Sequence, residues 1–180
     1  MGEDDFPRSD RIVFCEFAEE FWGRGLAWYN DPEIIAATSD DPNPLTPEQF
    51  RKLIDRDRLC DTARMFGIRT SGGEPIGVIV LRGIDPNHRG ADLHLTVGEE
   101  AFRGRGYGAE AIRLAVAFAF ERLGLHKVLS TPFASNLPMI GCLKKCGFEE
   151  EGRLRDALWI GDRFMDVVVM GIINPMDSSS

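Results

Sequence analysis

Apolar and polar residues alternate along several segments of the chain, in the pattern typical of β-strands. The predicted strands span 11–17, 63–70, 75–84, 91–98, 126–133, 148–160 and 163–173. Other segments place apolar residues at helical spacing, and these predict helices over 18–30, from Pro47 onward, over 110–124 and over 136–147. The turns SGGE and GD each join two strands into a hairpin, because glycine supplies the backbone conformations that tight turns need.

The best-marked helix start lies at Thr46. Thr46 is followed by proline at the first helical position and by Gln49 three residues after the cap, which together form a capping box. The stretch before it, SDDPNPL at 39–45, predicts a proline-rich loop. Gly124 and Gly147 mark the ends of the two later helices.

The order of these elements predicts the fold class. The strands at 63–98 form an antiparallel meander, and the last two strands form a hairpin. Only the connection from 91–98 through the helix 110–124 to 126–133 has the form of a β-α-β crossover. The sequence therefore predicts an α+β fold in three layers, with a mixed, mostly antiparallel sheet that contains one parallel crossover.

Length and composition predict one domain over residues 1–180. A chain of 180 residues with 43% hydrophobic content can bury one substantial core. The amino terminus MGEDDFPRSD is acidic, whereas a secretory signal begins basic and continues apolar, and no apolar run approaches the roughly 20 residues of a membrane span. We therefore expect a cytoplasmic protein with a short acidic tail at its start and a Ser-rich tail at its end.

The negative charge is concentrated in the first third of the chain. The net charge is -8, and residues 1–60 hold 14 of the 29 acidic residues but 7 of the 21 basic ones. This distribution argues against nucleic acid as a partner of the amino-terminal part and permits a cationic one. A solvated acidic surface without a partner is the alternative interpretation.

The cysteines predict neither a metal site nor disulfides. Cys15, Cys60, Cys142 and Cys146 form no CxxC pair, and the spacing of the last two fits one face of a helix. We therefore expect buried thiols and no bound metal.

The motif that carries chemistry is AFRGRGYGAEAIRL, where Gly104, Gly106 and Gly108 precede a helix and two arginines flank them. Main-chain N–H groups at the start of a helix bind phosphate, and glycine lets the ligand approach closely. A tight turn without a ligand is the alternative.

The lysine and hydroxyl of a Walker loop are absent from this motif, which disfavours phosphoryl transfer. Gly104, Gly106 and Ala109 match GxGxxA, but the gap after Val97 is too long and the next strand lacks an acid, so a dinucleotide site is disfavoured.

Four motifs in the right order resemble the GNAT N-acetyltransferases over residues 11–173. Arg103-x-x-Gly106-x-Gly108 resembles the R/Q-x-x-G-x-G/A signature of that family. HKVLSTPFASNLPMIGCLKKCGF resembles its later strand and helix, with Asn136 at the helix start. WYNDPEI and the final hairpin EGRLRDALWIGDRFMDVVVMGI resemble the branch of the ribosomal-protein-alanine acetyltransferases.

The resemblance implies the acyl-CoA N-acyltransferase fold with acetyl-CoA as co-substrate. It implies that the strand segment 95–97 splays from its parallel neighbour at a bulge, that the pantetheine arm lies in the opening, and that an N–H near Val97 stabilises the oxyanion. The cofactor-binding residues that it implies are Leu95, Val97, Arg103, Gly104, Arg105, Gly106, Tyr107, Gly108, Ala109 and Asn136.

Acetyl transfer to a neutral amine needs a group that removes a proton and a group that protonates the thiolate. Asp92 and His94 alternate onto one face of the strand near Val97, so both are candidate bases, and each also has a structural interpretation. Many relatives place a tyrosine seven residues after the asparagine as the acid. Leu143 stands there in this chain, which leaves the acid unassigned.

We therefore expect an N-acetyltransferase that works by direct attack in a ternary complex. A module that binds acetyl-CoA without turnover is the alternative, and the absent tyrosine favours it. The acceptor is expected to be a small amine or a protein N-terminus, bound beside residues 18–58, where the acidic charge lies. The resemblance also allows a homodimer, and it includes neither nucleic acid nor a membrane as partner.

Overall fold

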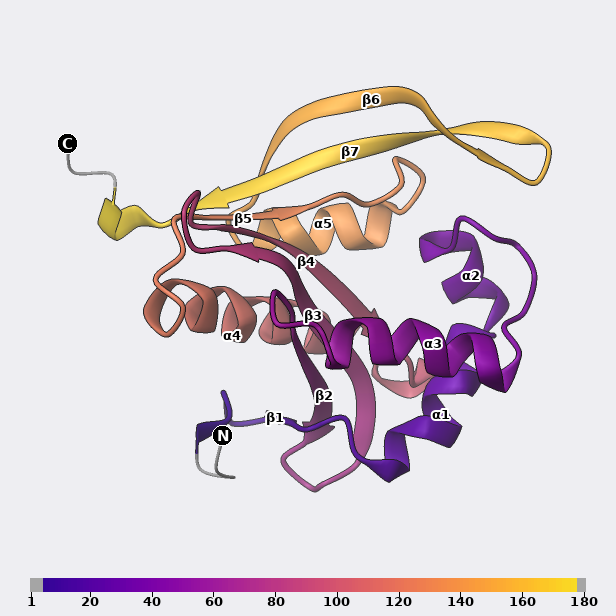
Figure 1. Cartoon of the computed structure of the whole chain (residues 1–180), viewed down its shortest axis with the longest axis horizontal. Coiled ribbons are helices and arrows are strands. Elements are labelled where there is room, and N and C mark those ends of the chain that lie inside the picture. Colours follow the sequence, from indigo (N-terminus) through magenta and orange to yellow (C-terminus); the bar gives the residue numbers. More distant parts are fainter. Residues whose placement is uncertain (1–4, 178–180) are drawn as a thin grey trace.

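The computed structural model describes residues 5–177 and confirms the predicted fold class (Figure 1). Within these residues a 7-stranded sheet has the order β1-β2-β3-β4-β5-β7-β6. The strands are β1 (Ile12–Cys15), β2 (Arg64–Thr70), β3 (Pro75–Asp85), β4 (Gly90–Val97), β5 (Lys127–Ser130), β6 (Glu149–Ile160) and β7 (Arg163–Ile173). β4 and β5 pair in parallel, as predicted, and the other neighbouring strands pair antiparallel. The start of the acidic tail (1–4) and the serines 178–180 lie outside the described residues.

The helices include one that the sequence pattern did not predict. They are α1 (Glu19–Tyr29), α2 (Pro32–Thr38), α3 (Pro47–Arg58), α4 (Tyr107–Glu121) and α5 (Leu137–Lys145), with short 3-10 turns at Glu100–Phe102 and Pro175–Asp177. The missed helix is α2, which at 7 residues is too short to show a repeating apolar face. Asp31 caps it and proline occupies its first turn, the same signature that predicts α3 at Thr46.

The helices cover the two faces of the sheet, and each face has its own core. Residues of β3 alternate between them: Ile79 and Leu81 pack with α4 and α5, whereas Val78 and Val80 pack with α1, α2 and α3. The arrangement gives the three layers that the sequence predicts. The hairpin of β6 and β7 extends along one edge, beyond the helices that cover the centre of the sheet (Figure 1).

A seam opens in the sheet where β4 and β5 part. Their parallel pairing covers Gly90–Asp92 and Lys127–Leu129, and the Ser130 hydroxyl then donates a hydrogen bond of 2.9 Å to the carbonyl of Leu93. Shortly afterwards the chain reaches Pro132, whose backbone has no N–H to continue a ladder. The predicted splay of residues 95–97 is thus present.

The bulge predicted at 95–97 lies just beyond that segment: the N–H groups of Gly98 and Glu99 both donate to the Ile76 carbonyl, at 2.8 and 3.3 Å, so two residues face one. The register of β3 with β4 continues without a shift up to the pair Gly77–Val97, and a further irregularity between these strands lies at the other end, between Arg82 and Asp85. The seam therefore opens where the pairing with the short β5 ends, well before the irregularity that follows Val97.

The cysteines only partly follow the prediction of buried thiols. Cys15, Cys142 and Cys146 are half-buried, but Cys60 is exposed, because it lies in the turn after α3. Within residues 5–177, no helix is long and apolar enough to cross a membrane. The same residues contain no cluster of three or more His, Cys, Asp or Glu side chains placed to hold a metal ion.

Candidate active site

The glycine loop ends in a helix start that is suited to an anion. Gly104 and Gly106 have φ values of 70° and 87°, which residues with a side chain rarely adopt. In the described part of the chain, no side chain caps α4. The N–H groups of Tyr107, Gly108 and Ala109 belong to its first turn and have no partner within the helix. The helix dipole adds a positive potential at this point, so the geometry favours phosphate oxygens.

Gly108 serves the packing of α4 against its neighbours. A Cβ at this position would lie 3.4 Å from Leu95 Cδ2, 3.6 Å from Val97 Cγ2 and 3.7 Å from Cys142 Sγ. It would thus point into the sheet and α5, and not toward a ligand outside the loop. The absence of a side chain brings the first turn of α4 close to the open end of β4.

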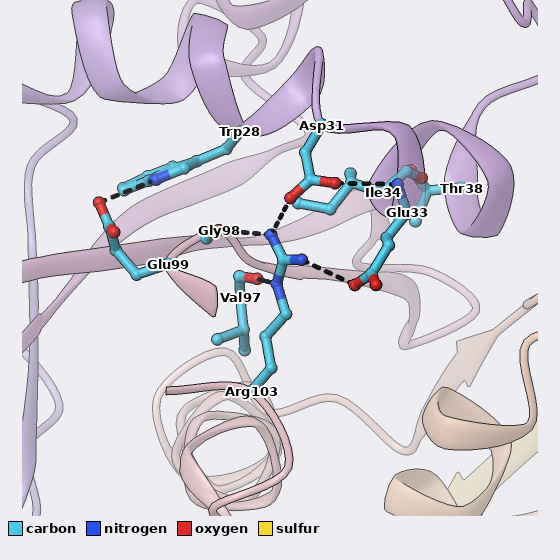
Figure 2. Close-up of polar contacts among 9 residues, drawn as sticks. All are labelled: Trp28, Asp31, Glu33, Ile34, Thr38, Val97, Gly98, Glu99 and Arg103. Carbon is cyan, nitrogen blue, oxygen red and sulfur yellow. Dashed lines mark hydrogen bonds and ion pairs between the residues drawn. The ribbon is translucent and has the colours of Figure 1, made fainter. Parts of the chain in front are cut away.

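The side chain of Arg103 is bound by the protein itself (Figure 2). Its Nη2 donates to Asp31 Oδ2 and to the Gly98 carbonyl, each at 2.6 Å, and its Nε donates to the Val97 carbonyl at 3.0 Å. Nη1 reaches Glu33 Oε2 at 3.1 Å. These contacts hold the guanidinium between the end of β4 and the start of α2.

Asp31 is fixed from two sides. Its Oδ1 accepts from the Glu33 N–H at 2.8 Å as the cap of α2, while Oδ2 accepts from Arg103. The hydrogen bond from Arg103 lowers the pKa of Asp31 below its ordinary value. Asp31 is therefore ionised at neutral pH.

A cleft of about 570 Å³ lies at the seam, on the face covered by α1, α2 and α3. Its walls combine the free end of β4 with the loops that follow α2 and β5. The lining side chains with chemical interest are Tyr29, Asp40, Asp41, Arg56, Arg82, His94, Thr96 and Asn136. The acidic loop of the sequence prediction therefore faces the seam, but two arginines share the same cleft.

Of the three predicted catalytic residues, only His94 lines this cleft. Asp92 lies on the same face two residues earlier, where β4 still pairs with Leu129 of β5. Burial raises the pKa of Asp92, and the nearby Arg82 acts in the opposite direction. The geometry brings His94 to the open seam and leaves Asp92 at its closed end.

His94 is neutral at physiological pH. Its pKa is lowered from 6.5 to about 4, chiefly by burial and also by the nearby charge of Arg82, while Asp57 opposes the shift. A neutral imidazole has a free nitrogen that can accept a proton or a hydrogen bond.

Folding stability is expected to fall as the pH is lowered from 6.5 towards 4. The unfolded chain takes up a proton at His94 near the ordinary pKa, whereas the folded protein takes it up only near the lowered one, so protons favour the unfolded state in this window. The slope from one proton is at most about 1.4 kcal/mol per pH unit. Asp92 contributes the opposite sign, because its pKa is raised on folding. His94→Gln should flatten the curve of melting temperature against pH, and an unchanged curve would exclude His94 as its cause.

The main chain of β4 presents N–H groups to the seam. The Leu93 carbonyl faces β5, as its hydrogen bond with Ser130 shows, and the Gly98 N–H faces β3 through its bond to the Ile76 carbonyl at 2.8 Å. The main-chain N–H and C=O groups of a strand alternate in direction from one residue to the next. Those of Leu95 and Val97 therefore point to the same side as the Leu93 carbonyl, toward the seam. The Val97 carbonyl accepts a hydrogen bond from Arg103. The main-chain N–H of Val97 points into the opening of the seam. The oxyanion role of Val97 stays a prediction.

Sequence reasoning missed Tyr29 and the ion pair beneath the cleft. Burial raises the pKa of Tyr29, and a hydrogen bond with Thr96 offsets part of this rise. Asp57 of α3 is 5% exposed and accepts from Arg82 Nε at 2.8 Å and from its Nη2. Asp57 lies in an amphipathic helix, where a charged residue is expected on the exposed face, so the sequence does not predict that Asp57 is buried. Its partner is 25 residues away in the chain.

The remaining predicted positions are also placed. Leu143 is fully buried in the core beside α4, so no proton donor occupies that position. Asn136 caps α5 by accepting from the Met139 N–H at 3.1 Å, and its amide donates to the Ala37 carbonyl at 3.1 Å. Arg105 is exposed in the glycine loop.

Comparison with known proteins agrees with this geometry. A profile described as "Acetyltransferase (GNAT) domain" matches residues 11–149. Spermidine N(1)-acetyltransferase from Vibrio cholerae is 27% identical over 126 residues, 70% of this chain and 72% of its own. The "Putative ribosomal N-acetyltransferase YdaF" of Bacillus subtilis is 28% identical over 134 residues, 73% of each chain. The crystal structure of spermidine N-acetyltransferase from Vibrio cholerae with CoA and spermine has a TM-score of 0.82 at 22% identity, covering 92% of this chain and 96% of the other.

The sheet with one parallel pair and an open seam is thus the fold of the N-acetyltransferases. The chain belongs to the GNAT acetyltransferase family. It is an acetyl-CoA-dependent enzyme that transfers the acetyl group to an amine, as the sequence resemblance predicts.

Proposed function

We propose that the acceptor is an amine that carries a further positive charge, and that it binds in the cleft on the helical face of the seam. The single observation that carries this proposal is the position of Asp40 and Asp41, which line the cleft together with His94. Hydrogen bonds from Asn43 lower the pKa of Asp41, so this carboxylate is ionised at neutral pH. The attacking amine must itself be neutral, and attraction to these carboxylates therefore requires a second cationic group on the acceptor.

The arginines of the cleft do not cancel this attraction. Arg82 is paired with the buried carboxylate of Asp57, and Arg56 lies 3.5 Å from the same carboxylate. Asp40 and Asp41 have no such cationic partner among the ion pairs of the described residues. Spermidine and spermine, which appear in the names of similar proteins, are amines of this kind. Protein N-termini with a nearby lysine or arginine are the second class that fits.

We assign proton removal from the amine to His94, through a water molecule or directly. His94 faces the cleft as a neutral imidazole, whereas Asp92 lies at the closed end of the seam. The glycine loop with the exposed Arg105 would hold the pyrophosphate, and the Val97 N–H would stabilise the oxyanion. The amine then attacks the thioester carbon, the C–S bond breaks, and the CoA thiolate leaves. The thiolate takes its proton from solvent or from the protonated His94, since Leu143 supplies none.

Neutralising both carboxylates in Asp40→Asn/Asp41→Asn should raise the KM of a polycationic amine about tenfold, and leave the KM of acetyl-CoA within about twofold. The effect should shrink with added salt, because exposed charges are screened over about 8 Å at physiological ionic strength. Initial rates with spermidine across a salt series measure both KM values. Glu48→Gln/Asp55→Asn, on the neighbouring helix, removes two carboxylates that do not line the cleft. Equal kinetics in the two double variants would contradict the charge argument.

The experiment that tests the function combines binding with turnover. Acetyl-CoA should raise the melting temperature, because it binds only the folded state, and nicotinamide nucleotides should not. Thiol release is then measured with spermidine, lysine-containing peptides and uncharged monoamines. Stabilisation without release for every amine would favour the alternative of a binding module without turnover. Faster release with monoamines would exclude the proposed acceptor class.

We also propose a cytoplasmic homodimer. Leu154, Trp159 and Phe164 are 54%, 60% and 58% exposed on the hairpin of β6 and β7, which supports self-association there. Acetyl-CoA as co-substrate supports a cytoplasmic location. Sedimentation equilibrium of the purified protein, together with Trp159→Ser, tests the assembly, and a monomer at all concentrations would exclude it.

A further inference from the structure

Helix α2 is attached at both ends to chain segments that come from opposite sides of the seam. At its start, Arg103, which follows β4, binds the capping carboxylate of Asp31. Near its end, Asn136, which follows β5, donates to the Ala37 carbonyl at 3.1 Å. The helix therefore links the segment that continues one splayed strand to the segment that continues the other.

The attachment at the start is a network and not a single pair (Figure 2). Arg103 binds two carbonyls of the β4 end as well as two carboxylates of α2, and its side chain is 21% exposed. Beside it, Glu99 Oε1 accepts from Trp28 Nε1 at 3.1 Å and from Arg24 at 2.8 Å. The turn after β4 is thus fixed to both α1 and α2.

The far end of α2 leads directly into the acceptor wall. Residues 37–41 line the cleft, and they include both carboxylates of the proposed acceptor site. The loop that follows α2 ends at Leu45, whose main chain forms two hydrogen bonds with the Asn30 side chain, at 2.7 and 2.9 Å. A displacement of α2 would therefore move Asp40 and Asp41 relative to His94.

We propose that Arg103 and Asn136 are positioning residues for the acceptor, and that they set acceptor recognition through α2 instead of binding the cofactor. The inference rests on the proposed acceptor site. The Arg103 side chain donates to four oxygens within the protein, and Asn136 donates to the Ala37 carbonyl. The main-chain N–H of Arg103 donates to the Glu100 carbonyl at 3.0 Å. The pyrophosphate is left to the main-chain N–H groups of residues 104–109 and to Arg105.

The test compares three single variants that break different parts of this attachment. Arg103→Gln and Asp31→Asn each remove one partner of the same ion pair. Asn136→Asp keeps an acceptor for the α5 cap but loses the donor to Ala37. All three should raise the acceptor KM about tenfold and change the acetyl-CoA dissociation constant less than about twofold. The double variant Arg103→Gln/Asp31→Asn should cost no more than the larger single effect, because both changes break one contact.

Arg105→Gln is the matched comparison, since it removes an arginine two positions away in the same loop. It should raise the dissociation constant of acetyl-CoA and leave the acceptor KM unchanged. If Arg103→Gln instead weakens acetyl-CoA and spares the acceptor, Arg103 is a cofactor ligand and the inference is wrong. Unchanged values for both substrates would also overturn it.

Calorimetry and amide hydrogen exchange separate this inference from the proposed function. Arg103→Gln should accelerate exchange over residues 32–41 while its acetyl-CoA dissociation constant stays the same. These two measurements need no turnover. If the wild-type protein acetylates no amine, the proposed function fails, but unchanged exchange or weakened acetyl-CoA binding in Arg103→Gln would still overturn the attachment.

Discussion

Gly106→Val is expected to weaken acetyl-CoA binding by at least about tenfold. Gly106 has a φ of 87° at the residue before α4, and for a residue with a Cβ the left-handed conformation costs roughly 1–2 kcal/mol. The loop would relax to a negative φ and turn the N–H groups of the first helical turn away from the phosphate. Titration calorimetry with acetyl-CoA measures the loss directly.

Two further variants show whether the backbone conformation is the cause. Gly106→Asn should bind acetyl-CoA better than Gly106→Val, since asparagine tolerates a positive φ better than a β-branched residue does. Gly23→Val is the control, because a Cβ at Gly23 would lie more than 4 Å from every described atom outside its own stretch of α1. Gly108→Val should also weaken binding, by pushing α4 away from Leu95 and Val97. Full affinity in Gly106→Val would show that this loop does not hold the phosphates.

Asp57→Ala is expected to lower the free energy of unfolding by roughly 2–4 kcal/mol. Asp57 is 5% exposed, and its loss would leave the guanidinium of Arg82 without its carboxylate. Removing one partner of a buried pair costs about 3–5 kcal/mol, and the lower range applies because the Arg82 side chain is 28% exposed. Urea unfolding of the purified variant measures the change.

Asp55→Ala is the control on the same helix. Asp55 pairs with Arg58 at 3.1 Å, but the arginine side chain is 46% exposed, so this loss should cost less than about 1 kcal/mol. Asp57→Leu/Arg82→Met removes both charges and should recover much of the stability lost in Asp57→Ala. Equal effects of Asp55→Ala and Asp57→Ala would contradict the role of burial.

The parts of the fold that depend on neighbouring residues could be predicted from the sequence. The capping box of α3 needs only Thr46 and Gln49, and both of its hydrogen bonds are present, at 2.8 and 3.2 Å. The strands and the parallel crossover follow from alternation and element order. The helix α2 was missed although Asp31 and the proline after it mark its start, because the pattern is too short to reveal an apolar face.

The part of the candidate site that consists of main-chain groups could be predicted from the sequence. The part that consists of side chains far apart in the sequence could not. Three closely spaced glycines predict the glycine loop, and two of them have positive φ in the structure. The partners of Arg103 lie 70 and 72 residues away, and no spacing in the sequence relates them. The bulge expected at 95–97 lies at Gly98 and Glu99, and the seam opens earlier, where β5 stops pairing with β4 after Asp92.

The groups that the proposed function assigns to the cofactor and to the acceptor come mostly from separate stretches of sequence. Residues 95–109 form the side of the seam that carries the glycine loop, whereas residues 29–58 supply most of the helical wall of the cleft. Under the proposed function, a substitution on the helical wall changes the amine site directly and leaves the glycine loop intact, whereas Arg103 acts on the same wall from the loop side through Asp31. A change of preferred amine is therefore expected to arise from substitutions within residues 29–58 or at the two side chains that hold α2 in place, Arg103 and Asn136.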